Sequence, residues 1–193
     1  MDHADHVGLI RAGVEGAGRR WLELGAGRGA FTLALADLLG PGAEIVAVDR
    51  DRNDLATLAA TMARGFPETR LTTVVADFSR QLPVEPSFDG LLAANAFHFV
   101  RDPRALIDGV RPLLRDGARI VVVEYDSDSG NPWVPHPFSF RTWEGIASGA
   151  GLAGTRLIGR VPSRFLGAIY AAASEIASEP VLHSRPHGSD REE

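Results

Sequence analysis

Apolar runs and helical stretches alternate along the first two thirds of the chain. Short apolar runs bounded by turn residues predict strands at residues 20–24, 44–48, 71–75, 88–94 and 119–125. Apolar spacing predicts helices between them at residues 30–39 and 51–64, and a proline suited to a first helical turn predicts another at 103–114. Strands that alternate with helices form parallel sheets with right-handed crossovers. The pattern therefore predicts an α/β fold.

The last third departs from this alternation. Residues 126–139 are rich in proline, and residues 140–150 have the pattern of a helix. Two further strand-like runs, at 155–161 and 165–172, are separated by a short proline-containing turn, and we expect them to form a hairpin that closes the sheet. Residues 179–193 have too little apolar content to pack, so we expect a disordered tail there.

The segment WLELGAGRGAFT, residues 21–32, leads from the first predicted strand into the first predicted helix. It places Glu23 in the strand and then Gly25, Gly27 and Gly29 at alternate positions. Glycine is favoured where a turn needs positive φ or where the backbone approaches a ligand closely. A dinucleotide loop has the spacing G-x-G-x-x-G, so the third glycine comes one residue early here. Glu23 would repel a pyrophosphate and attract a cation, which favours S-adenosylmethionine, with its sulfonium and amino groups.

Polar residues also follow the next three predicted strands: Asp49 after the second, Asp77-Phe78 after the third, and Asn95 after the fourth. Open α/β sheets bind ligands at the carboxyl ends of their strands. We therefore expect these residues to lie at one edge of the sheet with the glycine loop.

With these motifs, nearly the whole chain resembles the class I S-adenosylmethionine-dependent methyltransferases. The loop E-x-G-x-G-x-G is similar to the first motif of that family, which implies cofactor contacts from Glu23, Gly25, Ala26, Gly27 and Gly29. The resemblance implies that Asp49 binds both ribose hydroxyls, that Asp77 and Phe78 hold the adenine, and that Asn95 lies near the methionine amino group. These residues stand at the ends of successive predicted strands, from the first to the fourth.

The resemblance also implies the complete architecture. A family member has a Rossmann-like three-layer sandwich whose mostly parallel seven-stranded sheet has its last strand antiparallel. We therefore assign residues 165–172 to that reversed strand, and residues 1–178 to a single methyltransferase-like domain.

The residues themselves leave alternatives open. The glycines could serve a tight turn, and Asp49 or Asp77 could cap a helix that begins just after it. Phe78 could be a core residue, and Arg50 either flanks the adenosine or projects into solvent. Asn95 could simply form a turn.

Candidates for the methyl acceptor's side of the site come from two segments. His98 is either a packed, hydrogen-bonded residue or a base or orienting group for the acceptor. Tyr125 is a second candidate base, and Asp126, Trp133 and His136 are candidates for the acceptor wall. Asp126 and Asp128 with Asn95 could bind magnesium, but nothing in the sequence fixes their convergence, so we predict no metal. The alternative for residues 126–130 is a solvated turn.

Composition and charge limit the class of molecule that can be the methyl acceptor. The chain has 193 residues, no cysteine and a formal charge of -5, which suits one domain without disulfides and disfavours binding to nucleic-acid phosphates. Asn95-Ala96-Phe97 also lacks the proline that follows the Asn or Asp of amine-directed nucleic-acid methyltransferases. We expect a small-molecule acceptor.

No run approaches the ~18 apolar residues of a membrane span and no signal peptide is evident, so we expect a cytoplasmic protein.

The leading hypothesis is in-line transfer of a methyl group from S-adenosylmethionine to an oxygen, nitrogen or carbon nucleophile. One alternative is a methyltransferase-like partner or regulatory domain that binds the cofactor without catalysis. Another is an NAD-dependent oxidoreductase, which the glycine spacing and Glu23 oppose. The sequence leaves the oligomeric state open.

Overall fold

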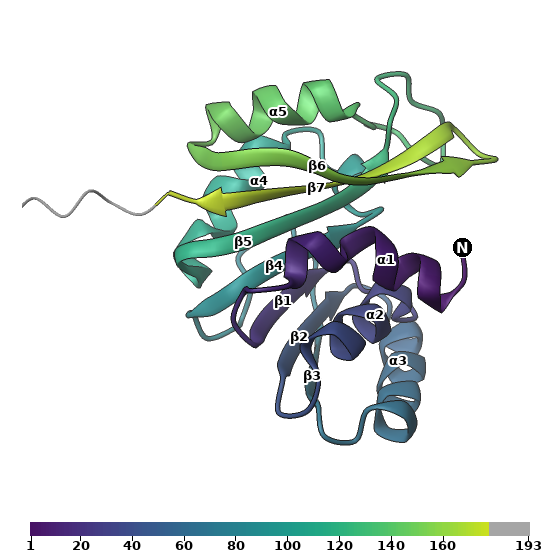
Figure 1. The fold of residues 1–193 in the computed structure, drawn as a ribbon, viewed down its shortest axis with the longest axis vertical. Helices are drawn as coiled ribbons and strands as arrows, with labels where there is room; N and C mark the ends of the chain where they lie inside the picture. Colours follow the sequence, from purple (N-terminus) through teal and green to yellow (C-terminus); the bar gives the residue numbers. More distant parts are fainter. Residues whose placement is uncertain (178–193) are drawn as a thin grey trace, which may run out of the picture.

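The computed structural model describes residues 1–177, which form a single seven-stranded sheet in the order β3-β2-β1-β4-β5-β7-β6 (Figure 1). The strands are β1 (Arg20–Leu24), β2 (Glu44–Asp49), β3 (Arg70–Val75), β4 (Phe88–Ala94), β5 (Leu114–Tyr125), β6 (Leu152–Ser163) and β7 (Gly167–Ile176). The first five strands are mutually parallel, and β7 runs antiparallel to both of its neighbours, β5 and β6. The predicted mostly parallel sheet with a reversed last strand is confirmed.

Helices cover both faces of this sheet (Figure 1). The helices α1 (His3–Val14), α2 (Ala30–Leu39) and α3 (Arg52–Gly65) share one hydrophobic core with the sheet. The helices α4 (Pro103–Val110) and α5 (Phe140–Gly149) share a second core on the opposite face. The fold is therefore the predicted three-layer, Rossmann-like sandwich.

The central strands are buried on both faces, as parallel strands between two helical layers must be. In β5, Ile120 and Val122 pack into the core with α4 and α5, whereas Val121 and Val123 pack into the other core. All four side chains are inaccessible to solvent. Burial on both faces explains why the strand is a continuous apolar run.

The structure differs from several of the predicted elements, and β5 begins at Leu114 rather than at residue 119. Helix α1 was not predicted, although a capping box between Asp2 and Asp5 starts it. The helix predicted over 103–114 ends at Val110 and continues only as the 3₁₀ turn η2 (Arg111–Leu113), because Pro112 has no N–H to extend it. The hairpin strands are longer than predicted. The tail predicted to be disordered lies outside the described residues.

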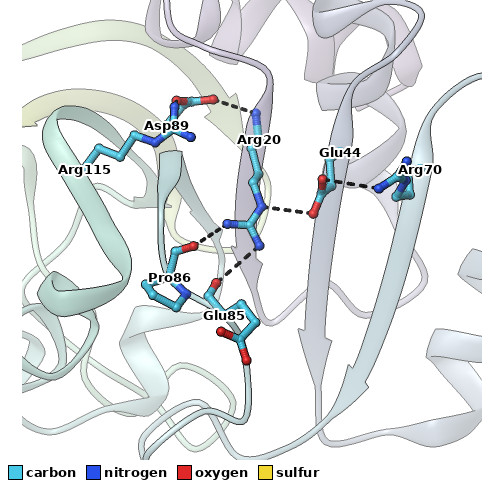
Figure 2. Close-up of polar contacts among 7 residues, drawn as sticks. All are labelled: Arg20, Glu44, Arg70, Glu85, Pro86, Asp89 and Arg115. Atoms are coloured by element: carbon cyan, nitrogen blue, oxygen red, sulfur yellow. Dashed lines mark hydrogen bonds and ion pairs between the residues drawn. The ribbon is translucent and has the colours of Figure 1, made fainter.

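A polar network ties together the amino ends of the sheet's first strands (Figure 2). The Arg20 guanidinium donates to Glu44 at 3.0 Å and to the backbone carbonyls of Glu85 and Pro86. The Asp89 carboxylate accepts from the Arg20 backbone N–H at 2.9 Å. These contacts fix one end of the sheet, while the opposite, carboxyl ends of the same strands carry the cavities described next.

Candidate functional site

The first cavity, of about 410 Å³, lies at the carboxyl ends of the parallel strands. It brings together six of the predicted cofactor-binding residues on its wall, namely Gly25, Asp49, Arg50, Asp77, Phe78 and Asn95. Asp49 is the last residue of β2, and the other five lie in the loops that follow β1, β2, β3 and β4. The expectation that they share one edge of the sheet agrees with this arrangement.

The glycine loop between β1 and α2 needs glycine for two reasons. Gly25, Gly27 and Gly29 all have positive φ, of 74°, 51° and 92°. A Cβ on Gly25 would also lie 2.6 Å from the Cβ of Ala96, which is on the cavity wall. The backbone N–H of Gly25 donates to the Val48 carbonyl at 2.8 Å, which binds the loop to the end of β2.

Asp49 holds the same loop from the neighbouring strand. Its Oδ2 accepts a 2.7 Å hydrogen bond from the Gly27 N–H, and its Oδ1 accepts from the Asp51 N–H at 2.9 Å. The cap of α3 is Asp51, which accepts from the N–H groups of Asn53 and Asp54. Asp49 is thus a half-buried carboxylate on the cavity wall rather than the helix cap.

Glu23 lies among buried groups rather than on the cavity wall. Its side chain is 2% exposed, and its Oε2 has no hydrogen-bond partner among residues 1–177. Burial raises the pKa of Glu23 to about 8; the nearby Asp49 carboxylate adds to the rise and Thr32 opposes it. In the free protein at neutral pH this acid is therefore mostly protonated. Ala26, Gly27 and Gly29 are likewise absent from the wall of this cavity.

The same cavity carries the residues predicted to hold an adenine. Asp77 is exposed and accepts from the N–H and the hydroxyl of Ser79 at 3.0 and 2.6 Å, and these bonds lower its pKa. Phe78 is half-buried and packs against the core while lining the cavity. The Arg50 guanidinium lies 6.0 Å from the centre of the Phe99 ring. Asp77 therefore both shapes a turn and presents a carboxylate to the cavity.

A second cavity, of about 450 Å³, adjoins the first. Its wall consists of Asn95, His98, Tyr125, Trp133, Val134 and Phe165. Asn95 lines both cavities, has a φ of 51°, and carries a buried Oδ1 without a partner among the described residues. Asparagine tolerates this left-handed conformation better than other side-chain-bearing residues. Asn95 therefore stands at the junction of the two cavities.

His98, on the 3₁₀ turn η1 (Phe97–Phe99), is paired with a buried acid. Its Nδ1 lies 2.8 Å from Oε2 of Glu124, and its backbone N–H donates to Oε1 of Glu124 at 3.2 Å. The two side chains are 4% and 0% exposed. The pairing of Glu124 with His98 was not predicted; the available signal was an acid inside the buried run of β5. Because Glu124 occupies Nδ1, the imidazole has its other nitrogen, Nε2, available to a ligand.

Other residues predicted for the acceptor wall lie elsewhere. Asp126 accepts from the Phe140 N–H at the start of α5 and pairs with Arg160. The backbone N–H of His136 donates to the His98 carbonyl at 3.0 Å, but neither Asp126 nor His136 lines the second cavity. Asp128 binds Ser139, the N-cap of α5. Within residues 1–177, no group of three His, Asp or Glu side chains is arranged to bind a metal.

Tyr125 lines the second cavity and is partly buried. Burial and the charge of Glu124 raise the pKa of its hydroxyl. A hydroxyl with a raised pKa stays protonated, so Tyr125 is a hydrogen-bond donor rather than a base at neutral pH. His98 is consequently the better placed proton acceptor of the two predicted catalytic residues.

The fold and the two adjoining cavities define an α/β protein with a binding region at the carboxyl ends of its parallel strands. The methyltransferase domain family matches residues 22–120. The chain belongs to this family, and with its fold it is a member of the class I S-adenosylmethionine-dependent methyltransferases.

Two curated relatives and one solved structure illustrate the similarity. A probable cobalt-precorrin-6B C(15)-methyltransferase (decarboxylating) from Thermoplasma volcanium is 29% identical over 116 residues, covering 60% of this chain and 55% of that protein. The highly reducing polyketide synthase stpks1 of Strobilurus tenacellus is 31% identical over 126 residues, covering 61% of this chain and 4% of the synthase. The YcgJ protein of Bacillus subtilis superposes with a TM-score of 0.71 at 17% identity, over 91% of this chain and all of that one.

The chain thus spans about half of the first relative and a small part of the second. The likeness to YcgJ concerns the fold alone. Across residues 1–177, no helix has the length and apolar character that a bilayer crossing requires.

Proposed function

We propose that this protein transfers a methyl group from S-adenosylmethionine to an oxygen, nitrogen or carbon nucleophile of a small molecule. The observation that carries the proposal is the meeting of two cavities at Asn95, one lined by the glycine loop and strand-end acids, the other by His98 and aromatic rings. Family membership supports the same reaction.

The residues present fit the cofactor. Gly25 lines the cavity without a side chain, so a ligand can meet the backbone there. Asp49 offers a carboxylate suited to two vicinal hydroxyls, and Phe78 offers an aromatic face suited to adenine. The unpartnered Asn95 Oδ1 would accept a hydrogen bond from the methionine amino group.

Glu23 would act through the field of a buried charge. A cation bound above the glycine loop favours the ionised form of a nearby acid, so binding would lower the raised pKa of Glu23. Charges interact strongly where water is excluded. In this way the loop would favour a positively charged ligand over a pyrophosphate.

When bound, the cofactor supplies a methyl carbon on a positively charged sulfur, which is open to in-line attack. The protein then mainly aligns the acceptor and excludes water, which is a large part of the rate enhancement in such reactions. His98 would take the acceptor's proton at Nε2, while Glu124 orients the ring and stabilises its protonated form. Asn95, at the cavity junction, would position the two reactants.

Thermal unfolding with separate additions of S-adenosylmethionine, S-adenosylhomocysteine and NAD tests the cofactor assignment. A ligand at about 100 times its dissociation constant stabilises by ~2.7 kcal/mol, which should raise the midpoint by roughly 5–10 °C for a chain of this size. We expect both sulfur compounds to stabilise the protein. Stabilisation by NAD alone would refute the proposal, and binding without methyl transfer to any acceptor would indicate a regulatory domain.

A further inference from the structure

The second cavity is lined mostly by rings. The centres of these rings follow one another at 6.0 Å from His98 to Tyr125, 5.7 Å from Tyr125 to Phe165 and 6.4 Å from Phe165 to Trp133. Aromatic rings pair in offset or edge-on arrangements at such separations. A flat aromatic ligand can therefore contact several of these rings at once.

Two of the rings are open to solvent at the cavity. The exposed fractions of Trp133 and Phe165 are 73% and 49%, large values for apolar side chains. Trp133 belongs to the segment before α5, whereas Phe165 lies in the turn between β6 and β7. Exposed apolar side chains that gather from separate segments mark binding surfaces. A ligand bound between them would be covered on two sides.

The absence of charged side chains on the cavity wall restricts the charge of the acceptor. Of the described residues that line the second cavity, none is Asp, Glu, Lys or Arg. An anionic acceptor would find no cation on this wall, and a cationic one would approach the positive sulfonium without a carboxylate to offset the repulsion. Unpaired charges are costly to bury. The acceptor that fits is neutral when it binds.

The base in this cavity restricts how weakly acidic the methylated group of the acceptor can be. His98, held by Glu124, is the base available on the wall. An aromatic hydroxyl has a pKa of about 10, as in tyrosine, whereas an aliphatic hydroxyl is a far weaker acid. For the same base, the ionised fraction of the aromatic hydroxyl is therefore larger by orders of magnitude. A phenolic hydroxyl suits both the base and the shape of the cavity.

We propose that the acceptor is a neutral, planar aromatic molecule that carries a ring hydroxyl, and that this hydroxyl is methylated. The proposal rests on the proposed function. The O–H bond breaks as its proton passes to His98, and the oxygen bonds to the methyl carbon while the carbon–sulfur bond breaks and leaves its electron pair on sulfur. The products are an aryl methyl ether, S-adenosylhomocysteine and one proton.

The test compares three hydroxyl compounds of similar size on the full chain. The probes are 2-naphthol, which is flat and phenolic, 2-naphthalenemethanol, which is flat but has an aliphatic hydroxyl, and decahydro-2-naphthol, which is not flat. Calorimetric titration with S-adenosylmethionine comes first, so that cofactor binding is known independently of the acceptor.

In protein saturated with S-adenosylhomocysteine, we expect both flat compounds to bind about tenfold more tightly than decahydro-2-naphthol. With S-adenosylmethionine, mass spectrometry should detect the methyl ether of 2-naphthol at about 100 times the yield from 2-naphthalenemethanol, or more. Phe165→Ala should weaken 2-naphthol binding about tenfold without changing cofactor affinity. The control is Leu157→Ala, which truncates an exposed apolar side chain outside the cavity and should change neither.

Equal binding of the three compounds to a protein that binds S-adenosylmethionine would overturn this inference and leave the proposed function standing. Methylation of the aliphatic alcohol in preference to the phenol would do the same. Failure of S-adenosylmethionine to bind would overturn both.

Discussion

Glu124 holds His98 at two points: its Oε2 lies 2.8 Å from the ring Nδ1, and its Oε1 accepts from the His98 backbone N–H at 3.2 Å. One carboxylate at the end of β5 thereby fixes both the ring and the backbone of a residue that follows β4. Because an ionised carboxylate only accepts hydrogen bonds, Nδ1 carries the ring proton in the neutral imidazole. The other nitrogen is then ready to take a proton.

Glu124→Gln should lower the free energy of unfolding by about 1–3 kcal/mol, because the amide has one acceptor oxygen for two buried donors. Chemical denaturation measures this change. Glu175→Gln is the matched control: Glu175 pairs with Arg119 at 3.3 Å but is 40% exposed, so its replacement should cost less than about 1 kcal/mol. Equal losses in both variants would argue against a special role for the buried pair.

The tautomer of His98 gives a separate readout of the same pair. In ¹⁵N NMR spectra at high pH, the wild-type ring should be protonated at Nδ1, whereas Glu124→Gln should populate the Nε2-protonated form. Loss of the signal in His98→Asn assigns it among the six histidines. An unchanged tautomer in Glu124→Gln would show that the carboxylate does not orient the base.

Gly25→Ala should destabilise the fold through two effects, the positive φ of 74° and the overlap of the new methyl group with Ala96. We expect a loss of about 2–4 kcal/mol, measured by denaturation. Gly16→Ala has a similar φ, 79°, with nothing within 4 Å of the added Cβ, so its cost should be about 1 kcal/mol. The difference between the two losses of unfolding free energy measures the effect of the close approach of Gly25 to Ala96. A difference near zero would contradict that approach.

Glu23 should make stability depend on pH. Its folded-state pKa is raised from 4.5 to about 8, so between these values the folded protein binds a proton that the unfolded chain releases. Stability from this group is therefore fully present below about pH 4.5 and is lost as the pH rises through about 8. The difference between the folded and unfolded pKa of Glu23 corresponds to about 5 kcal/mol as an upper value.

Glu23→Gln removes this titration. Denaturation curves of the variant between pH 5 and pH 9 should therefore decline less steeply than those of the wild type, by about 1 kcal/mol per pH unit. Parallel curves would mean that Glu23 is ionised in the folded protein at neutral pH.

Asp49→Asn should weaken binding of S-adenosylmethionine by about 1–3 kcal/mol, because it removes the charge from hydrogen bonds to the ribose hydroxyls. Isothermal titration calorimetry measures the effect. Asp37→Asn is the control, since Asp37 is 52% exposed on α2 and lies outside the cleft. Unchanged affinity in Asp49→Asn would refute the ribose contact.

Local sequence patterns sufficed to predict the five parallel strands and much of the first cavity, whereas the reversed last strand was assigned from the family resemblance. The glycine loop and Asp49 each follow an apolar strand directly, and parallel topology brings strand ends to one edge whatever the details of packing. The same reasoning located Asp77, Phe78 and Asn95 on the cavity wall. Residues that follow strands directly can therefore be predicted without knowledge of tertiary contacts.

The second cavity depends on contacts between distant segments. Glu124 and His98 are 26 residues apart, and the pairing is invisible until β4 and β5 are placed side by side. Phe165, in the hairpin turn, meets Trp133 only through the fold. Asp126 was selected for its position near a strand end, but contacts with the start of α5 and with Arg160 on β6 occupy its carboxylate. The residue types of the second cavity were therefore predictable, but their arrangement was not.

Calorimetric titration of the protein with S-adenosylmethionine, repeated with NAD, tests the central claim most directly. We predict saturable binding of one S-adenosylmethionine per chain, with release of a proton from Glu23 at pH 7 that is detected by comparing buffers of different ionisation heat, and no saturable binding of NAD. Saturable binding of NAD together with no binding of S-adenosylmethionine would contradict the account.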